Sequence, residues 1–209
     1  MAVDMKGKFI TFEGSEGSGK STQAALVLDY LKKKKVPATL LREPGGVKIS
    51  EAIRGILLDA ANKDMGDECE TLLYMAARAQ MVKEVLVPAL GSGTVVLCDR
   101  FLDSTIAYQG YGNGVDVALI KELGRFATQG IVPDRTFLFD IETAKGLART
   151  KLAKDRIELR PLDYHHHVRQ GYLELARLEP KRIKVITVDG SKEDIFKRVQ
   201  PFVDSLLCL

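Results

Sequence analysis

The chain has 209 residues, 45% of them hydrophobic and 28% charged, which is typical of a soluble protein long enough for one sizeable α/β domain. Its formal net charge of +3 is too small for a protein that coats nucleic acid, and its three scattered cysteines indicate a reducing compartment and not a disulfide framework. The first residues lack the apolar core of a secretory signal, and no apolar run approaches the ~18 residues that a membrane span needs. We therefore expect a single cytoplasmic domain over 1–209, with no nucleic-acid or membrane partner.

Short apolar runs alternate with segments of helical periodicity along the chain. In chain order, the sequence predicts a strand at 8–13, a helix at 21–35, a strand at 38–41, helices at 49–58 and 68–90, a strand at 94–98, helices at 104–108 and 115–128, strands at 136–139 and 183–188, and a last helix that begins near Ser191, where Ser191 and Asp194 form a capping-box pair. This alternation indicates a three-layer α/β fold, a five-stranded parallel sheet flanked by helices. Ligands of such sheets bind at the carboxyl ends of the strands.

The first strand leads into the motif G-x-x-x-x-G-K-S, formed by Gly14, Gly19, Lys20 and Ser21. Glycines let backbone N–H groups turn inward around a phosphate, and the following helix adds the positive end of its dipole. The lysine reaches the β- and γ-phosphates, and the serine hydroxyl ligates Mg²⁺. A Gly-rich turn with a surface lysine is the alternative, but the place between a strand and a helix favours a nucleoside triphosphate site. The residues predicted to form this site are Gly14, Ser15, Glu16, Gly17, Ser18, Gly19, Lys20, Ser21 and Thr22.

Two aspartates follow apolar strands and compete for the second Mg²⁺ ligand. Asp99 ends the third strand and is followed by Arg100 and a polar loop, whereas Asp140 ends the fourth. An acid at such a strand end holds Mg²⁺ in phosphate-loop enzymes, directly or through water. The arginine beside it favours Asp99, so Ser21 and Asp99 are the predicted metal ligands.

A phosphotransferase needs a second pocket for its acceptor, and two segments supply candidates. Tyr74 and Arg78 are four residues apart, hence on one helix face, where a ring and a guanidinium stack a base and bind a phosphate. A core tyrosine and a surface arginine are the alternative interpretation. The loop DRFLDSTIAYQGYGNG adds a dense polar set, whose alternative is a solvated loop: Arg100, Ser104, Thr105, Tyr108 and Gln109.

Five motifs together are more specific than any one of them: FEGSEGSGKST, REPGG, YMAARAQ, DRFLDSTIAYQG, and DRIE followed by YHHHVRQGY. In order and spacing the chain resembles bacterial thymidylate kinase from about 8 to 188. The resemblance implies the fold of phosphate-loop nucleoside monophosphate kinases and transfer of the γ-phosphoryl of ATP to dTMP. The products are dTDP and ADP, for dTTP biosynthesis. It also implies Mg²⁺ as cofactor and a homodimer.

The resemblance also implies roles for single residues. Glu16 matches an acid that accepts a hydrogen bond from the sugar 3′-hydroxyl, which explains a carboxylate inside a phosphate loop. Tyr74 matches the ring that stacks on thymine, and Arg78 the arginine near a base carbonyl. Arg100 matches the arginine that binds the acceptor phosphate. Further matches are Thr105 at the base, Tyr108 beneath the sugar, and Arg42 and Arg54 near the acceptor phosphate.

Residues 142–160 resemble a lid. Its stretch 145–160 holds six basic side chains and two acidic ones, which a solvated helix face also explains. Relatives with an acid-glycine pair in the phosphate loop, like Glu16-Gly17, place a catalytic arginine in the lid. Arg149 and Arg156 are the candidates, because Lys151 stands near the position where arginine is expected and lysine lacks the bidentate fork. With Lys20 and Arg100 they complete the predicted catalytic set.

Two rival functions stay open. Another phosphate-loop nucleoside or nucleotide kinase shares the donor half of the site, and a non-catalytic nucleotide switch shares its phosphate loop. The guanine-recognition motif N-K-x-D of such switches is missing from the sequence. The run His165-His166-His167 does not predict a zinc site, because three consecutive helical residues cannot face one ion.

Overall fold

The computed structural model describes residues 6–150 and 155–209, and these residues form a five-stranded parallel sheet in the order β2-β3-β1-β4-β5. The strands are β1 (Phe9–Glu13), β2 (Ala38–Arg42), β3 (Val95–Asp99), β4 (Arg135–Asp140) and β5 (Ile183–Thr187). All five predicted strands are confirmed, and their ends differ from the prediction by at most one residue. The central strand β1 is buried along its whole length, as expected of a strand covered on both faces.

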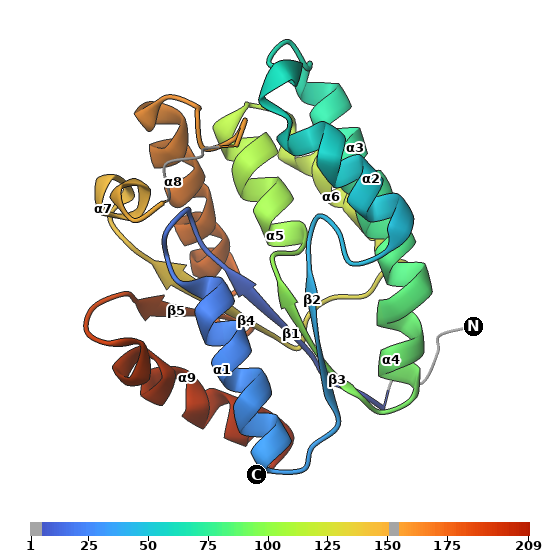
Figure 1. Ribbon diagram of the computed structural model, residues 1–209, viewed down its shortest axis with the longest axis vertical. Coiled ribbons are helices and arrows are strands. Elements are labelled where there is room, and N and C mark those ends of the chain that lie inside the picture. Colours follow the sequence, from blue (N-terminus) through green and yellow to red (C-terminus); the bar gives the residue numbers. More distant parts are fainter. Residues whose placement is uncertain (1–5, 151–154) are drawn as a thin grey trace.

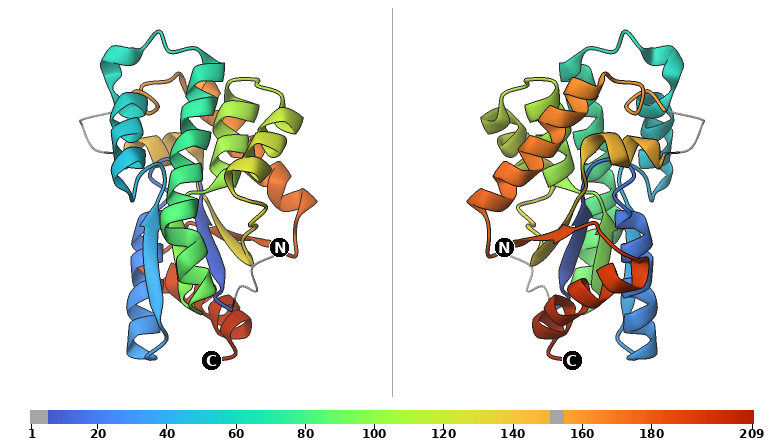
Figure 2. Two further views of the ribbon diagram at one scale, coloured as in Figure 1. Left: turned by 90° about the vertical axis from the view of Figure 1, so that its right-hand side faces the viewer. Right: turned by 90° about the vertical axis from the view of Figure 1, so that its left-hand side faces the viewer.

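Helices cover both faces of the sheet (Figures 1 and 2). On one face, α1 (Lys20–Lys33) and α9 (Lys192–Leu207) pack their apolar stripes onto alternate strand residues such as Ile10 and Phe12. On the other face, Phe9 and its neighbours pack against η2 (Val82–Leu86) and α4 (Val87–Gly91). Because successive strand residues point to opposite faces, Phe9 supplies one core, whereas Ile10 and Phe12 supply the other.

Most remaining helices stand beyond the carboxyl edge of the sheet, in the upper half of Figure 1. They are α2 (Lys48–Leu58), the short η1 (Ala60–Asn62), α3 (Asp67–Met81), α5 (Leu102–Thr105), η3 (Ile106–Gly112), α6 (Val117–Ala127), α7 (Thr143–Ala148) and α8 (Leu162–Leu178). A separate core joins η3, α6 and α8. None of the described helices is both long and apolar enough to cross a membrane.

Two predicted helices differ in detail. The segment predicted as one helix over 68–90 contains a wider π-type turn, η2, between α3 and α4. This turn ends at Leu86, two residues before Pro88, whose missing N–H breaks the ordinary helical hydrogen-bond pattern. The segment predicted at 104–108 extends over α5 and η3, from Leu102 to Gly112. At the start of α9, the capping box is confirmed, since Ser191 and Asp194 exchange side-chain and backbone hydrogen bonds.

Candidate active site

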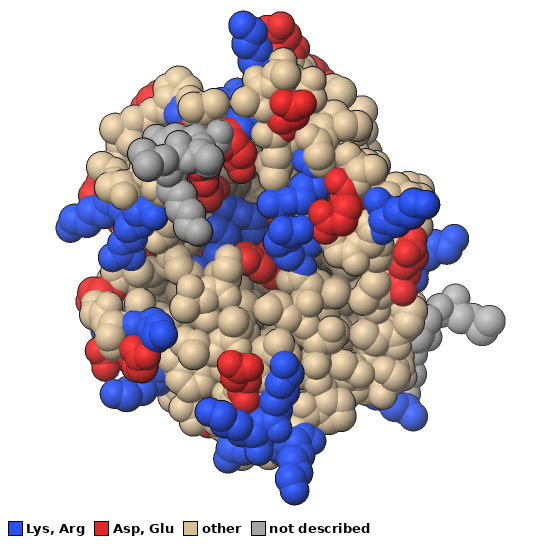
Figure 3. Space-filling model, viewed as in Figure 1, with Lys and Arg blue, Asp and Glu red and all other residues tan. Residues whose placement is uncertain are grey.

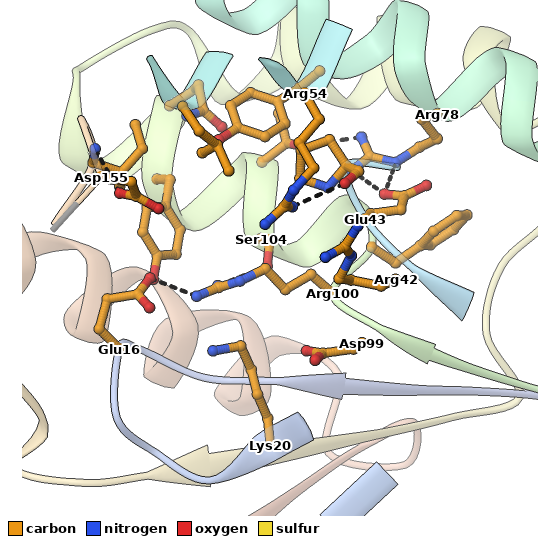
Figure 4. Close-up of a pocket in the computed structure, with 18 of the residues that line it drawn as sticks. Glu16, Lys20, Arg42, Glu43, Arg54, Arg78, Asp99, Arg100, Ser104 and Asp155 are labelled. Carbon is orange, nitrogen blue, oxygen red and sulfur yellow. Dashed lines mark hydrogen bonds and ion pairs between the residues drawn. The ribbon is translucent and has the colours of Figure 1, made fainter. Parts of the chain in front are cut away.

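A pocket opens at the carboxyl edge of the sheet, where the loops after β1, β2 and β3 meet. Figure 3 shows it as a hollow with basic side chains in and around it. Its walls come from the phosphate loop, α2, α3, the segment from 99 to 109, and the segment 155–158. Ten of the residues that line it are labelled in Figure 4. Segments far apart in the sequence thus meet in one place, as the parallel sheet predicts.

The phosphate loop lies between β1 and α1, and Lys20 is the first residue of the helix. Gly17 and Gly19 have positive φ angles of 68° and 81°, which side chains with a Cβ rarely adopt. A Cβ on Gly17 would also lie 2.0 Å from the carbonyl oxygen of Gly146, so α7 packs directly on the loop. The hydroxyl of Ser18 is buried and has no hydrogen-bond partner among the described residues, which suits a loop built to receive an anion.

A divalent cation has a fitting donor set beside this loop. The hydroxyl of Ser21 donates a hydrogen bond to Oδ2 of Asp99, so the two oxygen ligands already lie together. The other carboxylate oxygen, Oδ1 of Asp99, is buried without a hydrogen-bond partner in the described part of the chain. Hard oxygen ligands of this kind suit Mg²⁺. The competing Asp140 is engaged elsewhere, because Arg169 donates to both of its oxygens at 2.7 and 2.9 Å.

Glu16 is paired and does not stand free in the anion site. Its Oε1 lies 2.6 Å from Nη2 of Arg100 and accepts a hydrogen bond of 2.7 Å from the hydroxyl of Tyr108. Burial alone raises the pKa of Glu16, but Arg100, Lys20 and the Tyr108 hydroxyl together lower it to about 2. The carboxylate therefore stays charged at neutral pH and cancels part of the surrounding positive charge.

Arg100 adopts a left-handed backbone conformation, with φ 71°, directly after β3. The buried Glu13 supports this turn, since its carboxylate accepts hydrogen bonds from the amide of Phe101 at 2.7 Å and the hydroxyl of Ser104 at 2.5 Å. Burial, reinforced by the neighbouring Asp103, raises the pKa of Glu13 to about 8. The turn aims the guanidinium of Arg100 back over the phosphate loop, where it donates to the carbonyl of Gly14 at 3.2 Å.

Arg78 is buried and not a surface charge, with 2% of its area exposed. Its guanidinium forms an ion pair with Glu43 at 2.7 Å and donates to the hydroxyl of Thr105 at 3.0 Å. Tyr74, one turn earlier, lines the same pocket, and burial raises the pKa of its phenol far above the usual range. The ring and the guanidinium predicted from helical spacing thus face one cavity.

Two further arginines reach the pocket from β2 and α2. Arg42 pairs with Glu51 at 2.9 Å, and Arg54 donates to the carbonyl of Pro44 at 2.9 Å. Figure 4 shows both side chains and Arg100 directed toward the middle of the pocket, with Lys20 below them. Of the other predicted substrate contacts, Ser104, Thr105, Tyr108 and Gln109 also line the pocket.

The structure places the two lid candidates differently. Arg149 follows α7 and is exposed, and its Cβ lies 3.1 Å from where a Cβ on Gly17 would stand, beside the phosphate loop. Arg156 is 5% exposed, lies 2.5 Å from Oε2 of Glu70 and donates to the carbonyl of Leu57 at 2.9 Å. Arg156 is therefore held by Glu70 and Leu57 and does not line the pocket. Lys151 lies outside the described residues.

Sequence reasoning did not single out three buried carboxylates that shape this site. Glu13 supports the turn at Arg100, Glu43 pairs with Arg78, and Glu70 pairs with Arg156. A signal was present for Glu70, which precedes Tyr74 and Arg78 by one and two helical turns on the same face of α3.

With this geometry in place, comparison with known proteins decides the family. A family model described as thymidylate kinase matches residues 12–199. The chain belongs to the thymidylate kinase family. It is 46% identical over 200 residues to the thymidylate kinase of Symbiobacterium thermophilum, covering 95% of this chain and 94% of that one. With the thymidylate kinase of Kosmotoga olearia, identity is 47% over 203 residues and coverage is 96% of each chain.

The fold matches the thymidylate kinase family as well. A crystal structure of thymidylate kinase from Ehrlichia chaffeensis superposes with a TM-score of 0.79 at 32% identity, covering 94% of this chain and 98% of that one. The predicted phosphate-loop α/β fold is therefore confirmed, and the chain spans nearly the whole length of these relatives.

Proposed function

We propose that this protein transfers the γ-phosphoryl group of ATP to dTMP and so forms dTDP and ADP for dTTP biosynthesis. The observation that carries the proposal is that the basic pocket extends beyond the phosphate loop to Tyr74, Arg78 and Arg100. A nucleotide switch or a simple hydrolase needs only a positioned water there, whereas a phosphotransferase needs room for an acceptor. Membership of the thymidylate kinase family names that acceptor.

The donor side holds the triphosphate. Backbone amides of the phosphate loop and the ammonium group of Lys20 bind the β- and γ-phosphates. Burial and the neighbouring Arg100 lower the pKa of Lys20, while Glu16 and Asp99 act in the opposite direction. Ser21 and Asp99 hold Mg²⁺, which when bound neutralises phosphate charge and orients the transferring group.

The acceptor side binds and orients dTMP. Tyr74 offers a ring face to the base, and Arg78 and Thr105 offer polar groups at its edge. Glu16 and Tyr108, already joined by a hydrogen bond, form the position for the sugar. Arg100, with Arg42 and Arg54, binds the acceptor phosphate, and the charge of Glu16 keeps a misplaced phosphate away from the sugar position.

Transfer itself requires little proton chemistry. A phosphate monoester has a second pKa of about 6, so its oxygen is a competent nucleophile at neutral pH without a strong base. The difficulty is the approach of two anions in line, and positioned cations reduce that barrier. Figure 4 shows Lys20 below Arg100 in the pocket. We assign Lys20 to the donor, Arg100 to the acceptor phosphate, and Arg149 to the transferring group because it stands beside Gly17.

The proposal is tested by coupled ADP release with dTMP, dUMP, dCMP and dGMP as acceptors. We expect at least tenfold preference in kcat/KM for dTMP, equal to about 1.4 kcal/mol of transition-state binding. A larger rate with another monophosphate would assign the protein to that nucleotide instead. ATP hydrolysis that no monophosphate stimulates would favour the nucleotide switch.

We further propose that the protein works as a cytoplasmic homodimer. Large apolar side chains are exposed on α3 and α6, namely Leu72 at 54%, Leu119 at 48% and Phe126 at 85%. Water contact with such a surface is unfavourable, and a second copy would cover it. Light scattering after gel filtration should give twice the chain mass, and Phe126→Glu should shift the protein toward the monomer.

A further inference from the structure

Glu70 is a buried carboxylate that touches neither the phosphate loop nor the donor site. It lies in the first turn of α3 and none of its area is exposed. Removing a carboxylate from water is costly unless charged and polar partners surround it. Of the described side chains, four from two distant segments reach it: Gln109, Asn113, Arg156 and Arg160.

The first two partners, Gln109 and Asn113, belong to the segment 99–114, which we call the acceptor loop. Oε1 of Glu70 accepts hydrogen bonds from Nε2 of Gln109 at 2.7 Å and from Nδ2 of Asn113 at 3.2 Å. A carboxylate only accepts, so it draws the amide nitrogen of Gln109 toward itself. Because Gln109 lines the pocket, Glu70 controls which end of this amide the acceptor meets.

The other two partners belong to the segment 155–160. Oε2 of Glu70 lies 2.5 Å from Nη2 of Arg156 and 3.2 Å from Nη2 of Arg160. Arg156 is also tied to α2, since its backbone amide donates to the carbonyl of Leu58 at 3.3 Å. These contacts fix the segment at two points in its length.

The same segment forms one wall of the pocket. Asp155, Ile157 and Glu158 line the cavity on either side of the buried Arg156. Figure 4 shows Asp155 and Arg78 on opposite sides of that cavity. A segment without helix or strand structure keeps such a position only while its anchors hold. Glu70 is therefore the point at which α3, the acceptor loop and this wall are joined.

We propose that Glu70 is a positioning residue for acceptor binding, which holds the amide of Gln109 and the 155–160 wall in place around the nucleotide. The inference rests on the proposed function, because it assigns the pocket to the acceptor. It predicts that loss of the Glu70 charge weakens binding of the monophosphate and leaves binding of ATP unchanged. A residue that serves folding alone would reduce stability without this selectivity.

The test is Glu70→Gln, which keeps the size of the side chain and removes the charge that the two arginines share. We expect KM for dTMP to rise at least tenfold, KM for ATP to stay within twofold, and kcat to fall less than the dTMP KM rises. Calorimetric titration of dTMP without ATP should show the same loss of affinity. If the wild-type protein prefers another monophosphate, the proposed function fails. The role of Glu70 is then tested by the KM of Glu70→Gln for that monophosphate.

Two further variants make the result specific. Val199→Ala removes two methyl groups from a fully buried side chain of α9, so it controls for lost stability and should leave both KM values unchanged. The double variant Arg156→Met with Glu70→Gln should have a dTMP KM no higher than that of Glu70→Gln alone. The two substitutions break the same contact, the ion pair between Arg156 and Glu70, so their effects should not add.

An unchanged dTMP KM in folded Glu70→Gln would overturn the proposal. If that variant does not fold, Arg160→Met replaces it, since Arg160 is partly exposed and its loss leaves Arg156 paired. About a threefold rise in dTMP KM with constant ATP KM is then expected. Equal KM values for Arg160→Met and wild type would count against the role of Glu70.

Discussion

Arg100 Nη2 lies 2.6 Å from Oε1 of Glu16, so the guanidinium at the end of β3 neutralises the one carboxylate of the phosphate loop. The pair joins the segment after β3 to the phosphate loop. Under the proposed function, an arriving phosphate would compete with Glu16 for Arg100, so that the same guanidinium would serve the resting site and the bound acceptor.

Arg100→Ala should lower kcat/KM for dTMP by about 10² to 10³, the usual effect of losing one group that stabilises transition-state charge. Binding of ATP, followed by calorimetry, should change less than threefold because Lys20 and the loop amides stay in place. Arg177→Ala, at an exposed ion pair on α8, is the control and should behave as wild type. Undiminished turnover in Arg100→Ala would remove Arg100 from the mechanism.

Glu13→Gln should make folding stability less sensitive to alkaline pH. An acid whose pKa is raised from 4.5 to about 8 on folding binds its proton more tightly in the folded state. Its contribution to stability is therefore full below pH 4.5 and is lost as pH rises toward 8. The variant should match wild type at pH 5 and exceed it by about 4 kcal/mol at pH 8.5, the difference that these two pKa values imply between the two pH values. Urea unfolding at both pH values measures this, and equal losses in the two proteins would contradict it.

Asp99→Asn and Ser21→Ala should raise the Mg²⁺ concentration that gives half-maximal activity, with the larger effect, about tenfold or more, for Asp99→Asn because it removes a charged ligand. Asp140→Asn is a matched control, since Asp140 also ends a strand but is held by Arg169. A shift in the control as large as that in Asp99→Asn would show that the metal assignment is wrong. Steady-state rates over a Mg²⁺ titration at saturating ATP give the answer.

Arg149→Ala should reduce kcat by about 10² while both KM values stay near those of wild type, because a cation aimed at the transferring group acts mainly in the transition state. Arg149→Lys should recover only part of the rate, since an ammonium lacks the bidentate fork. Arg156→Met should instead destabilise the protein and raise the dTMP KM. A larger kcat loss for Arg156→Met than for Arg149→Ala would exchange the two roles.

Local sequence patterns were sufficient for much of the fold. Apolar runs at β1 through β5 and the glycines around Lys20 depend on interactions between near neighbours, so their spacing alone predicts strands and a phosphate loop. No bounds were predicted for α7 or α8, although the three histidines of α8 were treated as helical. In α8 this polar run interrupts the apolar stripe that packs onto η3.

The phosphate loop, the strand-end Asp99 and the helical pair Tyr74 and Arg78 were all visible in the sequence, because each depends on short-range spacing. Only the tertiary structure decided that Asp99 and not Asp140 meets Ser21, that Arg149 and not Arg156 lies at the loop, and that Glu70 joins segments 86 residues apart. Such partnerships depend on which strand ends and helices the chain topology brings together. Coulomb and hydrogen-bond energies act over a few ångströms of space, whatever the separation along the chain.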